Sequence, residues 1–571
     1  MKAHLFLYPN STGDARVTFE PDNHPGVTCS RLKREPHLAA PQIEEALNQP
    51  GAPEVLAFWD ERLGAFPWKA LERFSQSLDD IWHPGPTLTG SAEPDLLRHV
   101  NPLWVYRPDP KANLAGAVNW KVDLRAAFLR ARVLRKLGGL DGGFETLPGA
   151  ARELGFRWLK RGAVCRQQPS LLQNRPVHIE RVSLADRYRL VHLHYGARWT
   201  RYVLMRRIIG AHPLRELHAW RKGCAGSPGI AKAPTGAAHR PFDEVPLPEK
   251  VNISVVLPTY GRYKYVAEVL DDLRAQTIKP FQVLVADGNP ASERQPELYR
   301  KYADLPLEII WVDREGICIS RNECLRRVTG DYVLFLDDDS RVDDQNLESH
   351  LRVLTAYGAD VSVGPAYTRK RPELHPQQQE IACTFMDCGT TLCRHSILQE
   401  IGGFDMQFNE HLAGEDGELG IRMVRAGALM LNNPFAKRFH YLAPVGGARS
   451  SRNNLHRWRR WSFLPRPVQS IHYMARRHFE KAAAWDAVLQ SWILVGWRRA
   501  DGQPASFSWK ARTLMAELAG IPLSLIRLAR SVNFSREMLK EGPQIPSLDP
   551  TTNKRDRVQQ QEGELTAIIS A

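Results

Sequence analysis

The sequence predicts an α/β fold with two doubly wound bodies and a helical C-terminal extension. Between residues 251 and 336, short apolar runs typical of buried strands alternate with stretches of helical periodicity. A segment rich in Gly and Pro at residues 223–250 disfavours regular structure and divides the chain. A length of 571 residues also exceeds what one hydrophobic core usually organises. We therefore expect two bodies joined by a linker.

The elements of the second body follow one another in order. Strands are expected where apolar residues form short runs, at residues 251–258, 282–287, 307–312 and 333–336. Helices are expected where apolar residues recur on one face, at residues 263–276 and 320–328. Strands that alternate with helices predict a parallel sheet with right-handed crossovers.

Three consecutive carboxylates, Asp337, Asp338 and Asp339, follow the last of these strands. Their charges repel one another and gain nothing from burial, so a cation or another positive group is expected among them. The carboxyl ends of strands are also where open α/β sheets bind their ligands. The alternative is a solvated acidic turn after a strand, since short motifs often occur by chance.

The two bodies share a sequence pattern that indicates a degenerate duplication. Residues 137–141 followed by 153–163 resemble residues 401–405 followed by 418–428, with Gly-Gly, Asp, Glu-Leu-Gly, Arg and Gly-Ala in the same order. The interval between the two parts differs by one residue. Glycines that punctuate helices and loops could produce some of these matches.

The acidic residues are not shared between the two bodies. Glu415 and Asp416 precede the second Glu-Leu-Gly, whereas Ala150 and Ala151 stand at these positions in the first body. Residues 55–62 are the candidate counterpart of the triple-Asp strand and keep one Asp, in a register that the sequence leaves open. The first body is therefore expected to be a copy that has lost its metal and its base.

Composition and hydropathy exclude several classes of protein. The first residues stop being apolar too soon for a signal peptide, and no apolar stretch approaches the ~20 residues that a spanning helix needs. The eight Cys residues form no disulfide or zinc pattern. We expect reduced thiols and a cytoplasmic location, with peripheral contact at the inner face of the membrane as an option.

Basic residues gather between residues 446 and 479, where no Asp or Glu occurs, in a chain of net charge +14. Aromatic residues are interleaved with these arginines, which fits an anionic membrane surface, a nucleic acid or a diphosphate ligand. A solvated helical face is the simpler interpretation for most of them. Because the sequence contains no recognised nucleic-acid motif, no nucleic-acid partner is expected.

Five motifs occur in one order in the second body. They are Pro258-Thr259-Tyr260-Gly261-Arg262, Asp287, Gly316 with Ser320-Arg321-Asn322, Asp337-Asp338-Asp339 and Gly414-Glu415-Asp416-Gly417-Glu418-Leu419. With these motifs, residues 251 to 445 resemble a family 2 glycosyltransferase of the A-type nucleotide-sugar-binding fold. Two positions depart from the family pattern. Gly261 stands where Asn is common, and residues 286–289 read Ala-Asp-Gly-Asn where the family has two acids and Ser.

The resemblance implies a nucleotide-sugar donor and a divalent metal ion, Mn²⁺ or Mg²⁺, which would neutralise the leaving diphosphate. The metal ligands would be Asp339, Asp337 and His440, although a lone His is more often a satisfied core residue. Arg449, in a loop expected to be flexible, would cover the diphosphate of the bound donor. The other residues expected to bind the nucleotide sugar are Pro258, Thr259, Tyr260, Arg262, Asp287, Arg321, Asn322, Asp337 and Asp338.

The acceptor hydroxyl needs a carboxylate that takes its proton as the new bond forms. By resemblance, the second acid of the Glu-Asp pair, Asp416, is the base, and Glu415 is either an alternative base or a group that orients the acceptor. Both would lie in the first turn of a helix, where a carboxylate also stabilises the helix dipole. A base opposite the leaving group implies a single displacement with inversion at the anomeric carbon.

The expected function is transfer of a sugar to a glycan or lipid-linked glycan, as in polysaccharide and cell-envelope biosynthesis. The alternative is a non-catalytic glycan-binding or scaffold protein built from two transferase-like bodies. A basic helix at residues 512–530 is expected to pack on the catalytic body rather than rest on a membrane. The expected divisions are a degenerate domain at 1–222, a linker at 223–250, a catalytic domain at 251–448, a basic helical extension at 449–532 and a polar, disordered tail at 533–571.

Overall fold

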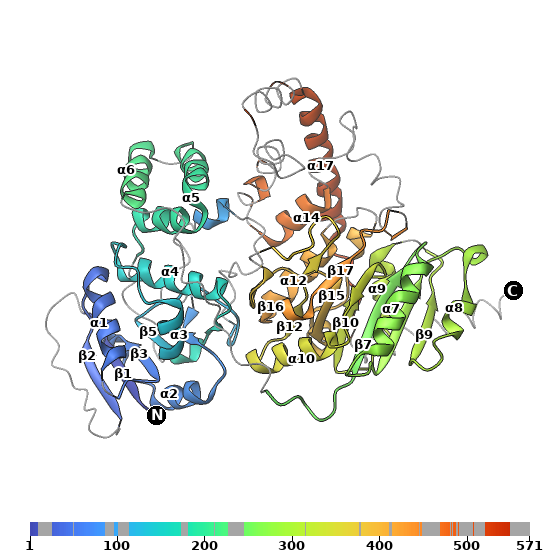
Figure 1. Ribbon diagram of the computed structural model, residues 1–571. Helices are drawn as coiled ribbons and strands as arrows, with labels where there is room; N and C mark the ends of the chain where they lie inside the picture. Colours follow the sequence, from blue (N-terminus) through green and yellow to red (C-terminus); the bar gives the residue numbers. More distant parts are fainter. Residues whose placement is uncertain are drawn as a thin grey trace, which may run out of the picture.

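The structure is a computed structural model in which two α/β bodies lie side by side (Figure 1). The described residues are 1–9, 26–49, 51–85, 96–100, 114–172, 181–209, 212–225, 245–314, 316–375, 378–409, 414–444, 446–447, 469–479, 481, 484–486, 489, 506, 515 and 520–548. One cluster of buried apolar side chains runs from the first body into the second. The two bodies therefore pack against each other.

The second body contains an eight-stranded sheet in the order β14-β16-β12-β15-β10-β7-β8-β9. The four predicted strands are β7 (Ile253–Thr259), β8 (Gln282–Asp287), β9 (Leu307–Trp311) and β10 (Tyr332–Leu336), and they pair in parallel. Their connections contain α7 (Tyr263–Ala275), α8 (Pro296–Arg300) and α9 (Ile317–Leu325). Every residue of β7 is buried, as its apolar run predicts. The predicted α/β class is confirmed.

The sheet is mixed, and the prediction of an entirely parallel sheet is wrong on one side. The strands on that side are β12 (Val361–Val363), β14 (Ala382–Cys383), β15 (Thr390–Arg394) and β16 (Met430–Asn432). β15 runs antiparallel to both of its neighbours, β10 and β12. The chain reaches β15 at the edge where β10 ends, since Thr390 is paired with Leu336. A strand that starts at this edge must run back across the sheet.

The first body has a six-stranded sheet in the order β2-β1-β3-β5-β4-β6. Its strands are β1 (Ala3–Leu7), β2 (Val27–Arg31), β3 (Val55–Trp59), β4 (Ile81–His83), β5 (Ala126–Arg130) and β6 (Cys165–Gln167). Its helices are α1 (Pro36–Asn48), α2 (Trp68–Gln76), α3 (Ala131–Leu137), α4 (Leu147–Lys160), α5 (Leu184–Ile208) and α6 (Pro213–Cys224). It is thus an α/β body as well.

A small third sheet lies beside the carboxyl end of β10 and brings a distant segment to it. Its strands are β11 (Ser340–Val342), β17 (Arg438–His440) and β13 (Ala366–Tyr367), in this order. Ser340, which directly follows the three aspartates, is paired with His440. This pairing places an imidazole next to the acidic strand end.

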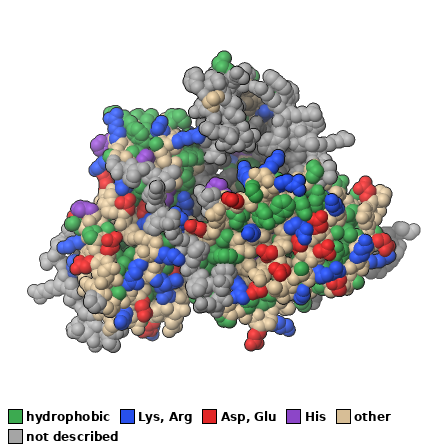
Figure 2. All heavy atoms as spheres, in the orientation of Figure 1, with side chains coloured by type: hydrophobic (Ala, Val, Ile, Leu, Met, Phe, Trp, Pro, Cys, Tyr) green, Lys and Arg blue, Asp and Glu red, His purple; other side chains and the backbone are tan. Residues whose placement is uncertain are grey.

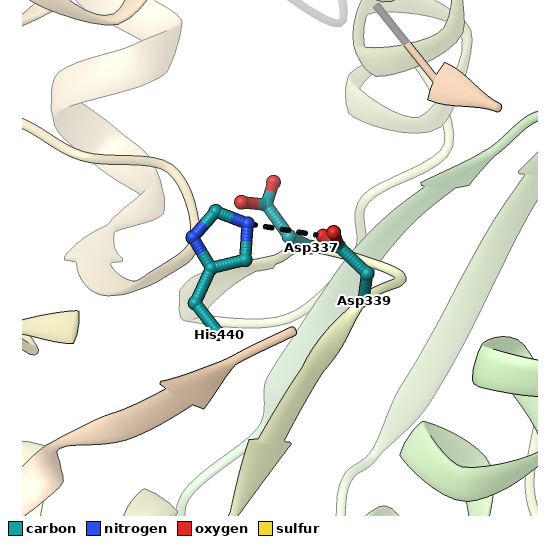
Figure 3. A group of neighbouring side chains, drawn as sticks. All are labelled: Asp337, Asp339 and His440. Atoms are coloured by element: carbon teal, nitrogen blue, oxygen red, sulfur yellow. Dashed lines mark ion pairs between the residues drawn. The ribbon is translucent and has the colours of Figure 1, made fainter. Parts of the chain in front are cut away.

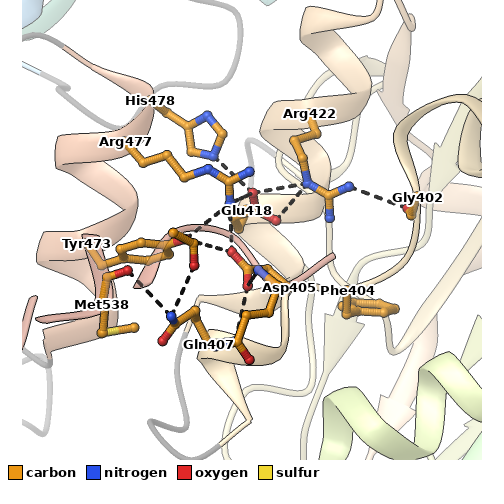
Figure 4. A network of polar contacts seen from close by, with 12 residues as sticks. Gly402, Phe404, Asp405, Gln407, Glu418, Arg422, Tyr473, Arg477, His478 and Met538 are labelled. Carbon is orange, nitrogen blue, oxygen red and sulfur yellow. Dashed lines mark hydrogen bonds and ion pairs between the residues drawn. The ribbon is translucent and has the colours of Figure 1, made fainter. Parts of the chain in front are cut away.

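The C-terminal helices α14 (Gln469–His478) and α17 (Ile521–Glu541) pack on the second body and on each other (Figure 1). The packing of α14 is polar (Figure 4), since Tyr473 and Arg477 contact Asp405 while Arg477 and His478 contact Glu418. A helical C-terminal extension is thus confirmed. The first residues of the helix predicted at 512–530 lie largely outside the described residues.

The structure differs from the prediction that a disordered tail begins at residue 533. Helix α17 continues to Glu541, and residues up to 548 lie against the second body. The Gly403 N–H donates to the carbonyl of Pro546, and the Met406 N–H donates to the carbonyl of Gln544. These backbone hydrogen bonds, together with the buried side chain of Leu548, order the segment that follows α17.

Acidic and basic side chains are interspersed on the face of both bodies that is visible in Figure 2. Among the described residues, every helix falls short of the length and hydropathy needed to cross a bilayer.

Asp486 links the C-terminal region to the first body. Its carboxylate is fully buried and lies 2.6 Å from Nδ1 of His99, while Tyr202 and Arg206 donate hydrogen bonds to it at 2.9 and 2.6 Å. Burial alone would raise the pKa of Asp486, but these partners outweigh it and lower the pKa. Asp486 therefore contributes to stability as a carboxylate.

Replacing Asp486 by Ala is expected to lower the free energy of unfolding by about 2–4 kcal/mol at neutral pH, because Arg206 loses a buried partner. The pKa of Asp486 is lowered in the folded state, so its contribution is present above its ordinary pKa of about 4 and is lost as the pH falls through the folded-state pKa. Thermal unfolding should show a difference in Tm that shrinks with falling pH. An equal loss on replacing the exposed Glu537 by Ala would contradict this account.

Candidate active site

The three aspartates after β10 do not share one environment. Asp337 is partly exposed, whereas Asp338 and Asp339 keep only 4% and 2% of their surface exposed. A solvated acidic turn would leave all three in water. That alternative therefore does not describe Asp338 and Asp339.

Asp337, Asp339 and His440 form a group that could hold a metal ion (Figure 3). One ligand atom from each residue lies within 4.8 Å of the other two, and His440 Nε2 is 3.3 Å from Asp339 Oδ1. Carboxylate oxygens suit Mg²⁺ and Mn²⁺, and imidazole is a common ligand of transition metals. The donor set therefore fits the expected cofactor, and the structure brings the three expected ligands together.

Asp339 is held in its ionised form. Burial alone would raise its pKa, but His440, Arg262 and the Ala443 N–H outweigh it and lower the pKa to about 2. The Ala443 N–H donates to Asp339 Oδ2 at 2.9 Å. A carboxylate must be deprotonated to bind a metal ion, so Asp339 is ready to do so at any physiological pH.

Arg438 is a residue of this site that the sequence reasoning missed. Its side chain is 3% exposed, and its guanidinium lies 2.9 Å from both Asp337 Oδ2 and Asp387 Oδ1. It also donates to the hydroxyl of Ser340 at 2.8 Å. Alternation along a strand places Arg438 on the same face as His440, which is the signal that could have revealed it. No comparable signal marks Asp387.

Arg262 is an internal partner of the buried acids. Its Nη1 lies 2.7 Å from Asp338 Oδ1 and 3.3 Å from Asp339 Oδ1, and the residue is 8% exposed. The hydroxyl of Thr259 donates to Asp338 at 2.9 Å. Burial raises the pKa of Asp338 to about 6, although Arg262 acts in the opposite direction. Arg262 and Thr259, both expected to contact the nucleotide sugar, thus satisfy Asp338 in this structure.

The loop after β17 packs on the loop after β7. The Gly447 N–H donates to the carbonyl of half-buried Tyr260 at 2.8 Å, and Arg262 donates to the carbonyl of Gly446 at 3.2 Å. Gly446 has a φ of +74°, and a side chain there would collide with the Tyr260 carbonyl, so glycine is required. Arg449, which was expected to cover the diphosphate, lies outside the described residues.

Helix α12 (Glu415–Arg425) presents Glu415 and Asp416 in its first turn, as expected. Gly414 precedes the helix with a φ of +96°, a conformation that favours glycine. Arg321 of α9 lies beside both acids, with Nη1 2.7 Å from Asp416 Oδ1 and 3.5 Å from Glu415 Oε1. Its Nη2 is 3.5 Å from Asp337 Oδ1. The guanidinium of Arg321 therefore connects the acid pair with Asp337, a member of the group that could hold a metal ion.

Asp416 has a second partner, since the Cys388 N–H donates to its other carboxylate oxygen at 3.2 Å. Glu415 is less well paired. Burial, with a smaller contribution from the charge of Asp416, raises the pKa of Glu415 from 4.5 to about 7. Near neutral pH Glu415 is thus protonated in a part of the molecules.

The raised pKa of Glu415 predicts a dependence of stability on pH. A carboxyl that binds its proton more tightly in the folded state stabilises the fold at low pH, and this stabilisation is lost as the pH rises from about 4.5 to about 7. Replacing Glu415 by Gln is expected to raise the free energy of unfolding by up to about 3 kcal/mol at about pH 8 without metal. At about pH 4 the variant and the wild type should unfold alike.

Thermal unfolding of both proteins at the two pH values checks this prediction. The matched control is Glu400→Gln, because Glu400 is exposed at the end of α11 (His395–Ile401). A similar rise of Tm in the control, or no rise in Glu415→Gln, would contradict the raised pKa of Glu415.

Asp287 does not face the site in the expected way. It is fully buried, and its carboxylate accepts hydrogen bonds from the hydroxyls of Tyr263 and Tyr299, both at 2.8 Å, and from the backbone and side-chain nitrogens of Asn289, at 2.9 and 2.7 Å. Four donors fill the acceptor capacity of a carboxylate. Asn289 in turn accepts from the Gly261 N–H. Asp287 therefore orders the loops after β7 and β8, and its contact with a nucleotide stays a prediction.

Asn322 and Pro258, which were expected to bind the nucleotide sugar, are both buried in the protein. Asn322 is 1% exposed, its side chain donates to the carbonyl of Phe404, and it accepts from the Phe404 N–H. Pro258 lies within the buried strand β7. The ring of Phe404 is 5.2 Å from the guanidinium of Arg321. Asn322 thus fixes the loop on which Arg321 rests.

Comparison with known proteins assigns the central part of this body. Residues 254–412 match the family described as glycosyl transferase family 2. The glycosyltransferase GlyA of Streptococcus pneumoniae is 26% identical over 123 residues, which cover 21% of this chain and 18% of that protein. A glucosyl-dolichyl phosphate glucuronosyltransferase of Haloferax volcanii is 24% identical over 223 residues, covering 34% of this chain and 70% of that protein.

Among solved structures, S. aureus TarS 1-349 in complex with UDP-GlcNAc is similar to this chain at 19% identity and a TM-score of 0.32, over 41% of this chain and 69% of that one. Residues 254–412, which include the acids at the end of β10, thus match glycosyl transferase family 2.

Proposed function

We propose that the second body is an active, metal-dependent glycosyltransferase that moves a sugar from a nucleotide-sugar donor to a glycan or lipid-linked glycan acceptor. The observation that carries the proposal is the position of Asp337, Asp339 and His440 next to the Glu415 and Asp416 pair, with Arg321 in contact with both groups. Sugar transfer needs a site for the leaving diphosphate and a base for the acceptor hydroxyl. The residues proposed for these two tasks lie close together, since Arg321 contacts both groups.

The donor half of the proposed site is preorganised by arginines. A divalent cation held by Asp337, Asp339 and His440 would neutralise the diphosphate as it leaves. Arg438 fixes the orientation of Asp337, and Arg262 lies against Asp339. Groups that are oriented before the substrate arrives need not reorganise during the reaction.

The acceptor half relies on Asp416 as the base. One of its oxygens is held by Arg321 and the other by the Cys388 N–H, so its orientation is fixed. Glu415 is the alternative base. Its pKa of about 7 leaves it protonated over part of the neutral range, a state that suits a group that donates a hydrogen bond to the acceptor. In this proposal Glu415 therefore orients the acceptor and Asp416 removes its proton.

A base on the face opposite the leaving diphosphate gives a single displacement with inversion of the anomeric carbon, by analogy with inverting glycoside hydrolysis. The anomeric configuration of the product, compared with that of the donor by NMR, tests this part of the proposal. Retention would require a nucleophile on the donor side, for which the proposal has no residue.

We further propose that the catalytic unit continues past residue 448 to residue 548. Helix α14 contacts Asp405 and Glu418, and Glu418 belongs to the same helix as the acid pair (Figure 4). Gln407 donates to the carbonyl of Met538 in α17. Removal of these helices would take Arg477 from Asp405 and both Arg477 and His478 from Glu418, which would keep Arg422, so the extension supports the helix that carries the base.

A panel of nucleotide sugars tests the function. Release of the nucleotide is measured with Mn²⁺ or Mg²⁺, with and without glycan or lipid-linked glycan acceptors. The proposal expects turnover with at least one donor and loss of turnover in EDTA. A wild-type protein that binds no donor and releases no nucleotide would favour the alternative of a non-catalytic glycan-binding or scaffold protein.

A further inference from the structure

Six strands of the first body have counterparts in the second that match in every pairing. The strands β1 to β6 correspond in chain order to β7, β8, β10, β12, β15 and β16. Each parallel neighbour in one sheet is a parallel neighbour in the other, and each antiparallel neighbour is antiparallel. A match of order and direction over six strands of a mixed sheet gives a strand-by-strand correspondence between the two bodies.

The two bodies also share a network of polar contacts around an arginine. Arg157 donates to the carbonyls of residues 137–139 and pairs with Glu153, just as Arg422 donates to the carbonyls of residues 401–403 and pairs with Glu418. A histidine completes each network. His194 Nε2 lies 3.0 Å from Glu153, and His478 Nε2 lies 3.0 Å from Glu418.

The same correspondence places the acidic strand end of the first body. β3 and β10 each have five residues, and each pairs over its whole length with an antiparallel strand that ends in Arg. In the first body the Asp60 N–H, directly after β3, donates to the carbonyl of Arg125. In the second body the Asp337 N–H, directly after β10, donates to the carbonyl of Gly389. Asp60 therefore stands in the place of Asp337, and two residues later Arg62 stands in the place of Asp339.

Arg62 brings a positive charge to the position at which the second body has Asp339, a candidate metal ligand. Its Nε and Nη2 lie 2.8 and 2.6 Å from the two oxygens of Asp60, and the Asp60 side chain is 5% exposed. A bidentate guanidinium–carboxylate pair satisfies the acid without a metal ion. In the described part of the first body, no strand corresponds to β17, which carries His440 in the second body.

A second arginine fills the neighbouring position. Gly389 of the second body leaves room for the guanidinium of Arg438, which a side chain at Gly389 would strike. In the first body Arg125 stands at the place of Gly389, and its own guanidinium pairs with Asp123 at 2.6 Å. Both members of this pair are 1% exposed. Arg125 thus pairs with the acid two residues before it, whereas Arg438 pairs with Asp387, the acid two residues before Gly389.

From these contacts we propose that the first body is a transferase-like domain whose donor site is closed by its own guanidinium groups, so that each chain carries one metal and nucleotide-sugar site. Arg62 takes the place of a metal ligand and neutralises Asp60. Ala150 and Ala151 stand in place of the acid pair on the corresponding helix, so the proton acceptor is missing as well. The first body then serves as a scaffold for the second, a role that fits its buried contact with Asp486. The count of one site rests on the proposed function of the second body.

Binding of Mn²⁺ alone to the full-length chain tests this proposal. The electron paramagnetic resonance signal of free Mn²⁺ is followed as protein is added, which gives the number of ions bound per chain without any catalytic readout. The expected result is one Mn²⁺ per wild-type chain, one per Asp60→Asn chain and none per Asp339→Asn chain. Glu61→Gln, at the partly exposed neighbour of Asp60, is a milder variant that should also keep one ion if Asp60→Asn does not fold.

The closed site of the first body would be overturned by two ions per wild-type chain. It would also be overturned by a single ion that is kept in Asp339→Asn but lost in Asp60→Asn or Glu61→Gln. Absence of Mn²⁺ from the wild type would contradict the proposed metal site of the second body and would agree with the closed site of the first. The two proposals can therefore fail separately.

Discussion

Replacement of Asp416 by Asn is expected to lower the rate of sugar transfer by about 10²–10⁴-fold while donor binding is kept, because the variant loses the group that takes the acceptor proton. The substitution is nearly isosteric. The new amide oxygen can still accept from Arg321 or from the Cys388 N–H, which both contact Asp416 in the wild type. Measurement of kcat at saturating donor and acceptor, together with the Kd of the donor, separates the two effects.

The control for this prediction is Asp344→Asn, since Asp344 is an exposed acid of the same body. Its transfer rate should equal that of the wild type. A rate within about tenfold of wild type in Asp416→Asn, with a much larger loss in Glu415→Gln, would exchange the roles of the two acids. Full activity in both variants would remove this acid pair from the mechanism.

Asp339→Ala is expected to weaken metal-dependent donor binding by more than about 100-fold, because residues that only support a metal ligand already cost 10–100-fold when replaced. Asp339 is 2% exposed and lies between His440 and Arg262. Without the carboxylate, His440 and Arg262 each lose a polar partner. Asp339→Asn keeps the shape of the side chain and serves as the second variant.

Isothermal titration with a nucleotide sugar, in Mn²⁺ and in EDTA, measures this effect. Wild type should bind the donor more tightly in Mn²⁺, and both Asp339 variants should lose the difference. If circular dichroism shows a folded protein and the Mn²⁺ dependence persists in Asp339→Asn, the metal assignment is wrong. The exposed control Asp344→Asn should behave as wild type.

The part of the fold that could be predicted from the sequence is the part whose residues are buried on both faces. The apolar runs of β7, β8 and β10 identify strands because no other element buries so many consecutive residues. The direction of β15 could not be predicted in this way. It depends on the edge at which the chain enters the sheet, and residues 364–389 determine that edge without a periodic pattern.

Helix α17 shows why the C-terminal prediction failed in detail. It buries Arg527, Ser531 and Ser535, whereas Leu525 and Ile526 are 51% and 46% exposed. Its burial is therefore the reverse of what hydrophobic periodicity predicts. The residues that follow it are ordered by backbone hydrogen bonds to Gly403 and Met406 and by the buried side chain of Leu548.

Residues of the candidate site could be predicted where a short motif gives both the type of side chain and its position in the fold. Asp337, Asp339 and His440 were expected from the sequence as metal ligands, and they lie together. Their role in catalysis stays a prediction. Arg438 was missed because its importance comes from pairing with Asp337, about a hundred residues earlier in the chain.

The residues Asp287 and Asn322 show what a motif leaves open, and their contact with a nucleotide stays a prediction. Each occupies a motif position that resembles a nucleotide contact, yet each is buried and fully engaged by neighbouring protein groups. A motif identifies where a polar side chain stands in the fold. It does not identify the hydrogen-bond partners, which come from other segments.

The most direct test of a single metal and donor site per chain is anomalous diffraction from a crystal of the full-length protein soaked with Mn²⁺ and a nucleoside diphosphate. The account predicts one Mn²⁺ peak per chain, within about 2.0–2.6 Å of Asp339 and of at least one further ligand among Asp337 and His440. A peak at Asp60 of the first body, or a Mn²⁺ ion bound to the diphosphate away from Asp339, would contradict it.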